Sequence, residues 1–162
     1  MSGTGNSDTA GVIAPPPLIY LVGLLLGLGT DWLCGLPALP YLRRWEGLDL
    51  GVGFGLGGLG LALILAAAGR FLKAGTKIPP HQPATVLVTG GLYRYSRNPI
   101  YLGLTMIYLG LAAGFASLGS LILLPGVLAA MVWGVIRREE SYLERKFGDT
   151  YRDYKARVRR WL

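Results

Sequence analysis

The chain of 162 residues is long enough for one domain, but its composition excludes an ordinary soluble one. Hydrophobic residues make up 52% and charged residues only 15% of the sequence, and the mean hydropathy is +0.44. The net charge of +7 comes from basic residues that flank apolar runs, since residues 50–69 and 104–136 carry no charge at all. We therefore expect an integral membrane protein whose anionic neighbours are lipid headgroups and not nucleic acid.

A single cysteine, Cys34, excludes an internal disulfide and a cysteine-based metal cluster, and we expect no metal site. Residues 1–14 are small and polar, which predicts a disordered tail ahead of one membrane domain, residues 15–162. The first span is predicted from residue 18 to about residue 34, near the lower length limit for crossing a bilayer. Asp31, close to its far end, is expected to anchor the helix at the membrane interface.

The second predicted span, residues 50–69, is rich in glycine. It contains the pairs Gly51-x-x-x-Gly55 and Gly53-x-x-x-Gly57, a spacing that lets helices approach closely in lipid. The loop that follows, residues 70–98, carries five basic residues and no acidic one, so the positive-inside rule makes it cytoplasmic. Its segment Ile78–Pro83 should be extended. We expect no catalytic role for His81 within it.

Two further apolar runs, residues 100–116 and 118–136, predict a helical hairpin. Four spans would place both termini and the basic loop on the cytoplasmic side. The fold class is therefore an all-α membrane protein with about four transmembrane helices and a cytosolic, amphipathic helical tail. Gly148 should end the first helix of that tail, and Asp149 should cap a second, basic helix lying along the membrane surface.

The segment GLYRYSRNPIYLG, residues 91–103, joins the basic loop to the third span. Asn98 is expected to cap a helix in which Pro99 takes the first position. The free N–H groups at such a helix start suit a ligand carboxylate, and the aromatic faces of Tyr93, Tyr95 and Tyr101 suit a cation and an adenosine-like ring. A zwitterionic amino acid with a sulfonium would satisfy these features together. An aromatic belt at the membrane interface is the structural alternative for the tyrosines.

The helical pattern after residue 132 places Glu139 on an apolar stripe, with Glu140 on the adjacent side. A carboxylate there needs a cationic partner. The partner is either an arginine, with Arg94, Arg97 and Arg138 as candidates, or a bound cation. The cation interpretation requires Glu139 to come within reach of the aromatic segment 91–103.

These residues together resemble the isoprenylcysteine carboxyl methyltransferase and phospholipid methyltransferase superfamily of integral membrane enzymes. The resemblance covers GLYRYSRNPIYLG, the preceding TVLVT and the tail REESYLERKFGDTYRDYKARVRRWL, roughly residues 74–162. It implies S-adenosylmethionine as methyl donor and a membrane lipid or lipidated small molecule as acceptor, reached from the bilayer. The cofactor-binding positions it implies are Thr85, Val86, Leu87, Val88, Tyr93, Asn98, Pro99, Ile100, Tyr101 and Glu139.

Within this resemblance, Glu140 and Tyr101 are the catalytic candidates, since an amine acceptor must lose a proton, whereas a carboxylate acceptor needs no base. Asn98 stands where the prenylcysteine enzymes have a histidine, and Val135 where they have a substrate-binding arginine. Arg137 and Arg138, nearby but out of register, are the substrate candidates. The alternatives are a non-catalytic lipid-binding or helix-packing module and a reductase that binds a nicotinamide.

Overall fold

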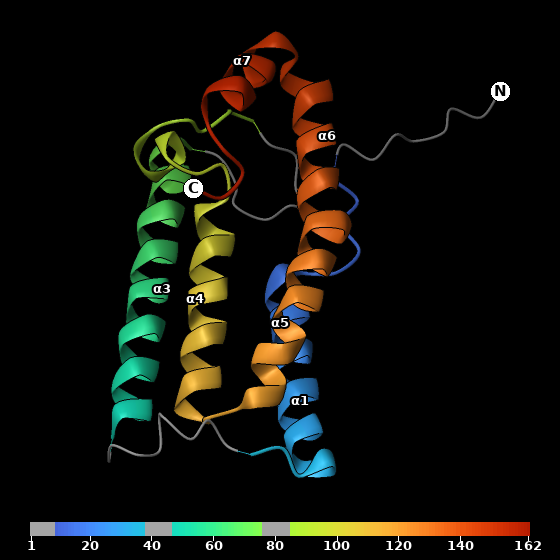
Figure 1. The fold of residues 1–162 in the computed structure, drawn as a ribbon. Coiled ribbons are helices and arrows are strands. Elements are labelled where there is room, and N and C mark those ends of the chain that lie inside the picture. Colours follow the sequence, from blue (N-terminus) through green and yellow to red (C-terminus); the bar gives the residue numbers. More distant parts are fainter. Residues whose placement is uncertain (1–8, 38–46, 76–84) are drawn as a thin grey trace, which may run out of the picture.

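The protein is a bundle of helices. The computed structural model describes residues 9–37, 47–75 and 85–162, and every regular element in these ranges is helical (Figure 1). The elements are α1 (Pro16–Cys34), α3 (Leu48–Lys73), the 3₁₀ turn η1 (Gly91–Arg94), α4 (Pro99–Gly114), α5 (Leu118–Met131), the π-helical turn η2 (Val132–Ile136), α6 (Arg137–Phe147) and α7 (Asp149–Arg157). The predicted extended segment and His81 lie outside the described residues.

Three helical stretches in the described residues are long and apolar enough to cross a membrane. They are α1, α3 and the continuous 30-residue run Leu118–Phe147. The helix α4 is also apolar but has only 16 residues. The predicted all-α membrane fold is confirmed.

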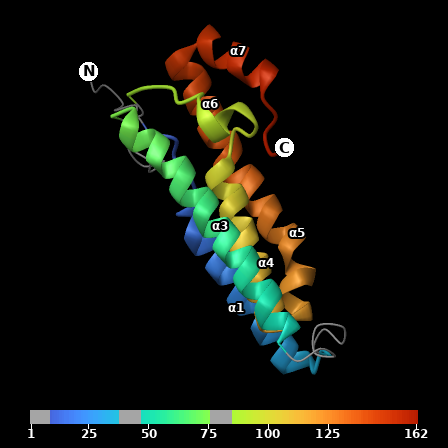
Figure 2. The same ribbon diagram turned by 90° about the vertical axis from the view of Figure 1, so that its left-hand side faces the viewer.

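The helices pack mainly as two pairs, α3 with α4 and α1 with α5. Figure 1 shows the members of each pair next to each other, and Figure 2 shows the bundle from the side of α3. The predicted hairpin of α4 and α5 exists as a short connection in sequence. Each of its helices nevertheless packs mainly on a different partner. The bundle thus brings the start of α4 and the end of the α5–α6 run to the same end of the molecule.

Glycine determines the contact between α3 and α4. A Cβ atom on Gly60 would lie 2.5 Å from the carbonyl oxygen of Gly103, and one on Gly53 would lie 2.9 Å from that of Gly110. The two backbones therefore touch, as small residues permit in lipid. The two predicted glycine pairs differ in their surroundings. Gly51 and Gly55 face open space, so only the pair that contains Gly53 takes part in this contact.

Asp31 joins α1 to the start of α5. Its carboxylate accepts a hydrogen bond from the backbone N–H of Gly119 at 2.6 Å and from the hydroxyl of Ser117 at 2.5 Å. These are N-terminal groups of α5 that no intrahelical carbonyl can satisfy. The interfacial position of Asp31 stays a prediction, and the structure adds hydrogen bonds from its carboxylate to the start of α5.

The π-helical turn η2 changes which side of α6 faces the protein. Such a turn inserts extra residues into the helical count, so a periodicity of three to four extrapolated across it loses register. Val135 and Ile136 are fully buried, and beyond them Glu140 is buried while Glu139 is only partly so. The side of α6 that carries Glu140 is thus buried as well as the predicted stripe with Glu139.

Residues 9–14 lie against the same turn. The N–H of Ile13 donates to the carbonyl of Gly134 at 3.2 Å, and the Arg138 guanidinium donates to the carbonyl of Gly11 at 2.8 Å. The predicted disorder therefore does not extend to this part of the tail. Residues 1–8 lie outside the described residues.

The helix α6 ends at Gly148, whose φ of 55° lies in the left-handed region that glycine tolerates. The helix α7 begins at Asp149, as predicted, but the aspartate does not cap it; its carboxylate accepts a hydrogen bond from Arg152 instead. One hydrophobic cluster, which contains Tyr20, Tyr101 and Met131, lies between the helices. The buried side chains of α7, Tyr151 and Tyr154, join a second hydrophobic cluster with Ala67 of α3. The apolar side of α7 consequently covers the end of the bundle.

Candidate functional site

The candidate site lies where α4 begins, at the end of the bundle that α7 covers. The helix starts at Pro99, as the sequence predicts. Asn98 precedes it but makes no side-chain cap; its Nδ2 donates to the carbonyl of Arg160 at 2.9 Å. The capping prediction is wrong, because no backbone N–H of the first turn of α4 donates to the Asn98 side-chain oxygen. The side-chain N–H instead donates to a carbonyl 62 residues away.

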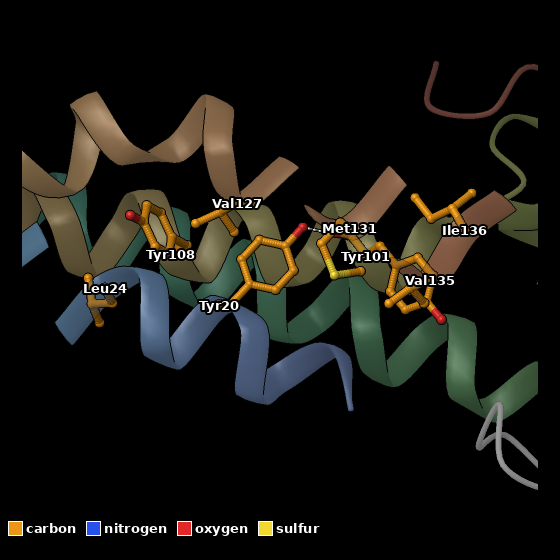
Figure 3. Close-up of a cluster of buried hydrophobic side chains, with 8 residues drawn as sticks. All are labelled: Tyr20, Leu24, Tyr101, Tyr108, Val127, Met131, Val135 and Ile136. Atoms are coloured by element: carbon orange, nitrogen blue, oxygen red, sulfur yellow. Dashed lines mark hydrogen bonds between the residues drawn. The ribbon is translucent and has the colours of Figure 1, made fainter. Parts of the chain in front are cut away.

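Tyr101 and Glu139 meet at this site. The Tyr101 hydroxyl donates to Oε1 of Glu139 at 2.6 Å, a short charge-assisted distance. Figure 3 shows the Tyr101 ring in the row of buried side chains that runs between the helices, beside Val135. The two polar regions singled out in the sequence therefore lie at the same end of the bundle and touch.

Tyr93 lies close to this pair. It is 6% exposed, and its backbone carbonyl accepts a hydrogen bond from Tyr154 at 2.7 Å. Burial, the neighbouring Tyr154 and the charge of Glu139 all raise the pKa of Tyr93. Its hydroxyl thus stays protonated at neutral pH and remains a hydrogen-bond donor.

Glu140 has different partners from Glu139. Its carboxylate accepts two hydrogen bonds from Arg160, at 3.0 and 2.7 Å, and lies 3.1 Å from Nη1 of Arg97. The Arg97 contact has the distance of an ion pair but not the geometry of a hydrogen bond. The hydrogen bonds to Glu140 raise the pKa of Arg160 further. Adjacent acids in the sequence therefore face two separate environments.

The segment predicted to bind cofactor ahead of η1 is only partly packed. Leu87 and Val88 lie against the second hydrophobic cluster, which contains Tyr93, whereas Thr85 and Val86 are exposed. Ile100 packs against both this cluster and the one that contains Tyr101. The predicted residues that the structure gathers most closely are thus Tyr93, Ile100, Tyr101 and Glu139.

The two predicted substrate residues have other contacts. The Arg137 guanidinium lies 5.7 Å from the ring centre of the exposed Trp133, and Arg138 holds the carbonyl of Gly11. Within the described ranges, no hydrogen bond or ion pair joins either arginine to the Tyr101–Glu139 pair. Val135, where the resembled enzymes have an arginine, is fully buried.

The sequence did not reveal that residues 158–162, hereafter the strap, return to the site. The backbone N–H of Arg97 donates to the carbonyl of Arg159 at 3.0 Å. Trp161 packs against the cluster that contains Tyr101. The alternation of basic residues with Val158 and Trp161 is compatible with a segment half-buried in protein. It does not indicate which part of the protein the segment packs against.

The fold and the site define a multi-pass integral membrane protein with an acidic and aromatic site at one end of its helices. The sequence model of the phospholipid methyltransferase family matches residues 48–150, more than half of the chain, and the chain belongs to this family. This finding confirms the superfamily resemblance.

Two relatives are similar over shorter stretches. The Protein-S-isoprenylcysteine O-methyltransferase of Schizosaccharomyces pombe is 37% identical over 73 residues, which are 45% of this chain and 31% of the relative. An uncharacterized protein of Haemophilus influenzae is 74% identical over 27 residues, 17% of this chain and 43% of that relative. The matches thus span less than half the length of either relative. No solved structure matches the chain.

Proposed function

We propose that this protein is a membrane methyltransferase that transfers a methyl group from S-adenosylmethionine to a lipid-like or membrane-partitioned acceptor. The contact between Tyr101 and Glu139 carries this proposal, together with family membership. When bound, S-adenosylmethionine supplies an electrophilic methyl group on a positively charged sulfur. The chain must supply a site that attracts this cation and orients it.

The residues present fit such a ligand. Glu139 is a partly buried carboxylate at the end of an apolar bundle, and a carboxylate in that position needs a cationic partner. Among the residues that the structure describes, its hydrogen-bond partner is the neutral Tyr101, and no arginine or lysine forms an ion pair with it. The three arginines that could have paired with it were Arg94, Arg97 and Arg138. Arg97 instead faces Glu140, Arg138 donates to a backbone carbonyl, and Arg94 is exposed.

In this proposal Glu139 holds the cationic part of the donor, and Tyr93, Tyr101 and Ile100 provide the aromatic and apolar walls. Leu87 and Val88, with the exposed Thr85 and Val86, border the site from the loop side. The acceptor is a carboxylate or an amine that reaches the site from the bilayer. The buried Val135 supports an acceptor other than a prenylcysteine carboxylate, since no arginine is available at that position.

We place the site and both termini on the cytoplasmic side, because the loop after α3 is basic and carries no acid. The helix-packing alternative predicts an arginine on Glu139 and no saturable ligand. The reductase alternative predicts nicotinamide binding. Each of these outcomes can be measured directly on the purified protein.

Calorimetry on the detergent-purified protein tests the proposal. Wild type should bind S-adenosylmethionine saturably and bind a nicotinamide dinucleotide not at all. Glu139→Gln should raise the dissociation constant roughly 10- to 100-fold, since it removes a charged partner. Glu144→Gln, the same change on an outward side of α6, serves as the matched control.

Absence of saturable binding to wild type would refute the proposal, and equal affinities of the two variants would refute the assigned pocket. The acceptor class follows from incubating the protein with labelled donor and a total lipid extract. The lipid fraction that acquires the label identifies it. Label in no fraction would argue for an acceptor outside the lipid class.

A further inference from the structure

We propose that Glu140 is a positioning residue: through Arg160 it holds the strap across the start of α4 and so keeps Tyr101 against Glu139. This inference rests on the proposed function. It assigns to Glu140 no contact with donor or acceptor. The two neighbouring acids then have different roles: Glu139 binds the ligand, and Glu140 keeps the residues around the ligand in position.

The first support is the way the strap is bonded to the residues before α4. The carbonyl of Arg159 accepts the N–H of Arg97 at 3.0 Å, and the carbonyl of Arg160 accepts Nδ2 of Asn98 at 2.9 Å. The Ser96 hydroxyl adds a longer contact to the same carbonyl at 3.4 Å. Three consecutive residues ahead of α4 are thus tied to two consecutive carbonyls of the strap.

The second support is the side chain of Arg160. Its Nε and Nη2 reach the two oxygens of Glu140 at 3.0 and 2.7 Å, the bidentate arrangement that gives an arginine–carboxylate pair a fixed geometry. One residue therefore contacts α6 through its side chain and the start of α4 through its backbone. The distance between these two helices determines whether Tyr101 meets Glu139.

The third support is burial on both sides of Arg160. Val158 belongs to the hydrophobic cluster with Tyr93, and Trp161 packs against the cluster with Tyr101. Glu140 itself is only 7% exposed, and both of its oxygens have guanidinium partners. A carboxylate so enclosed and paired is poorly placed to accept a proton from an acceptor.

Loss of the strap contacts should weaken donor binding and leave the rate of methyl transfer at saturating donor unchanged. If the strap is released, fewer molecules hold the arrangement that binds the donor, and the apparent dissociation constant rises by the inverse of the remaining fraction. Saturating donor restores that arrangement, because ligand binding favours the competent state. A residue that acts on the reactants would instead lower kcat at saturation.

The test compares Arg160→Gln with Arg159→Gln, an identical change at a neighbouring exposed side chain. Arg160→Gln and Glu140→Gln should each raise the dissociation constant roughly 10- to 100-fold, while kcat at saturating donor stays close to wild type. Arg159→Gln should behave as wild type. Arg160→Gln added to Glu140→Gln should cause no further loss, since the Arg160 side chain acts through Glu140.

Hydrogen exchange at the amide of Arg97 gives a readout that needs no ligand. This amide should exchange faster in Arg160→Gln and Glu140→Gln than in Arg159→Gln, because its acceptor lies on the strap. Unchanged exchange, an affinity of Arg160→Gln equal to that of Arg159→Gln, or a loss of kcat confined to Glu140→Gln would overturn the inference. Failure of the wild type to bind donor, with the expected exchange, would instead reject the proposed function alone.

Discussion

Replacing Gly60 by alanine should separate α3 from α4. The added Cβ would lie 2.5 Å from the carbonyl oxygen of Gly103 and 3.0 Å from the backbone nitrogen of Ile107, where ordinary contacts begin at 3.4 Å. The Ile107 side chain also lies 3.0 Å away through its Cγ1, but the closest atom is a backbone oxygen, so rotation of that side chain cannot relieve the overlap. The helices must move apart by about 1 Å, and overpacking of this kind costs about 1–3 kcal/mol.

Gly58→Ala is the matched control, because its Cβ would meet no atom within 4 Å. Both variants gain the same preference of alanine for a helix, up to about 1 kcal/mol. The difference between their free energies of unfolding in detergent therefore isolates the packing cost. We expect Gly60→Ala to be the less stable variant by about 1–3 kcal/mol.

The same substitution should reach the site. Tyr101 lies two residues before Gly103 on α4, so a displaced α4 carries its hydroxyl away from Glu139. Donor affinity should fall in Gly60→Ala and stay unchanged in Gly58→Ala. Equal stability of the two variants would show that α3 and α4 do not touch at this backbone contact.

Three further predictions concern single groups. Tyr101→Phe should raise the dissociation constant for S-adenosylmethionine roughly 5- to 10-fold, because Glu139 loses the hydroxyl that orients it through a hydrogen bond. If calorimetry gives an unchanged dissociation constant, Tyr101 is not part of the site. Tyr154→Phe should lower the free energy of unfolding by about 1 kcal/mol, because the hydrogen bond to the Tyr93 carbonyl is lost. A free energy of unfolding equal to that of wild type in a denaturation experiment would contradict this. Cys34, the sole cysteine, is exposed at the end of α1 away from the site. A membrane-impermeant maleimide should label it in intact cells, whereas protection until lysis would reverse the proposed orientation.

Local signals in the sequence were sufficient for the elements that carry the site. The hydropathy of the spans, the start of α4 at Pro99 and the end of α6 at Gly148 depend on residues close together in the chain. The acidic pair and the aromatic segment could likewise be assigned to one side from the count of spans. Sharing that side is a condition for the contact of Tyr101 with Glu139, which the folded structure shows.

Other features could not be read locally, because their partners lie far apart in the chain. Asn98 has the character of a capping residue, yet its oxygen accepts no N–H of α4, and its side-chain N–H donates to the carbonyl of Arg160. Asp31 has the position of an interfacial anchor, yet it binds the start of α5. In both cases local propensity identifies a polar group, and only tertiary packing decides which acceptor or donor reaches it.

By itself, the sequence determined that this chain is an all-α membrane protein with an acidic and aromatic cluster at one end, since hydropathy and helix signals act over short distances. The tertiary structure decided which acid faces which partner. The π-helical turn at Val132–Ile136 rotates the helix beyond it, and this turns Glu140 toward Arg97 and Arg160 while Glu139 meets Tyr101. A change of helical register is set by the contacts on both sides of the helix, and those contacts exist only in the folded chain.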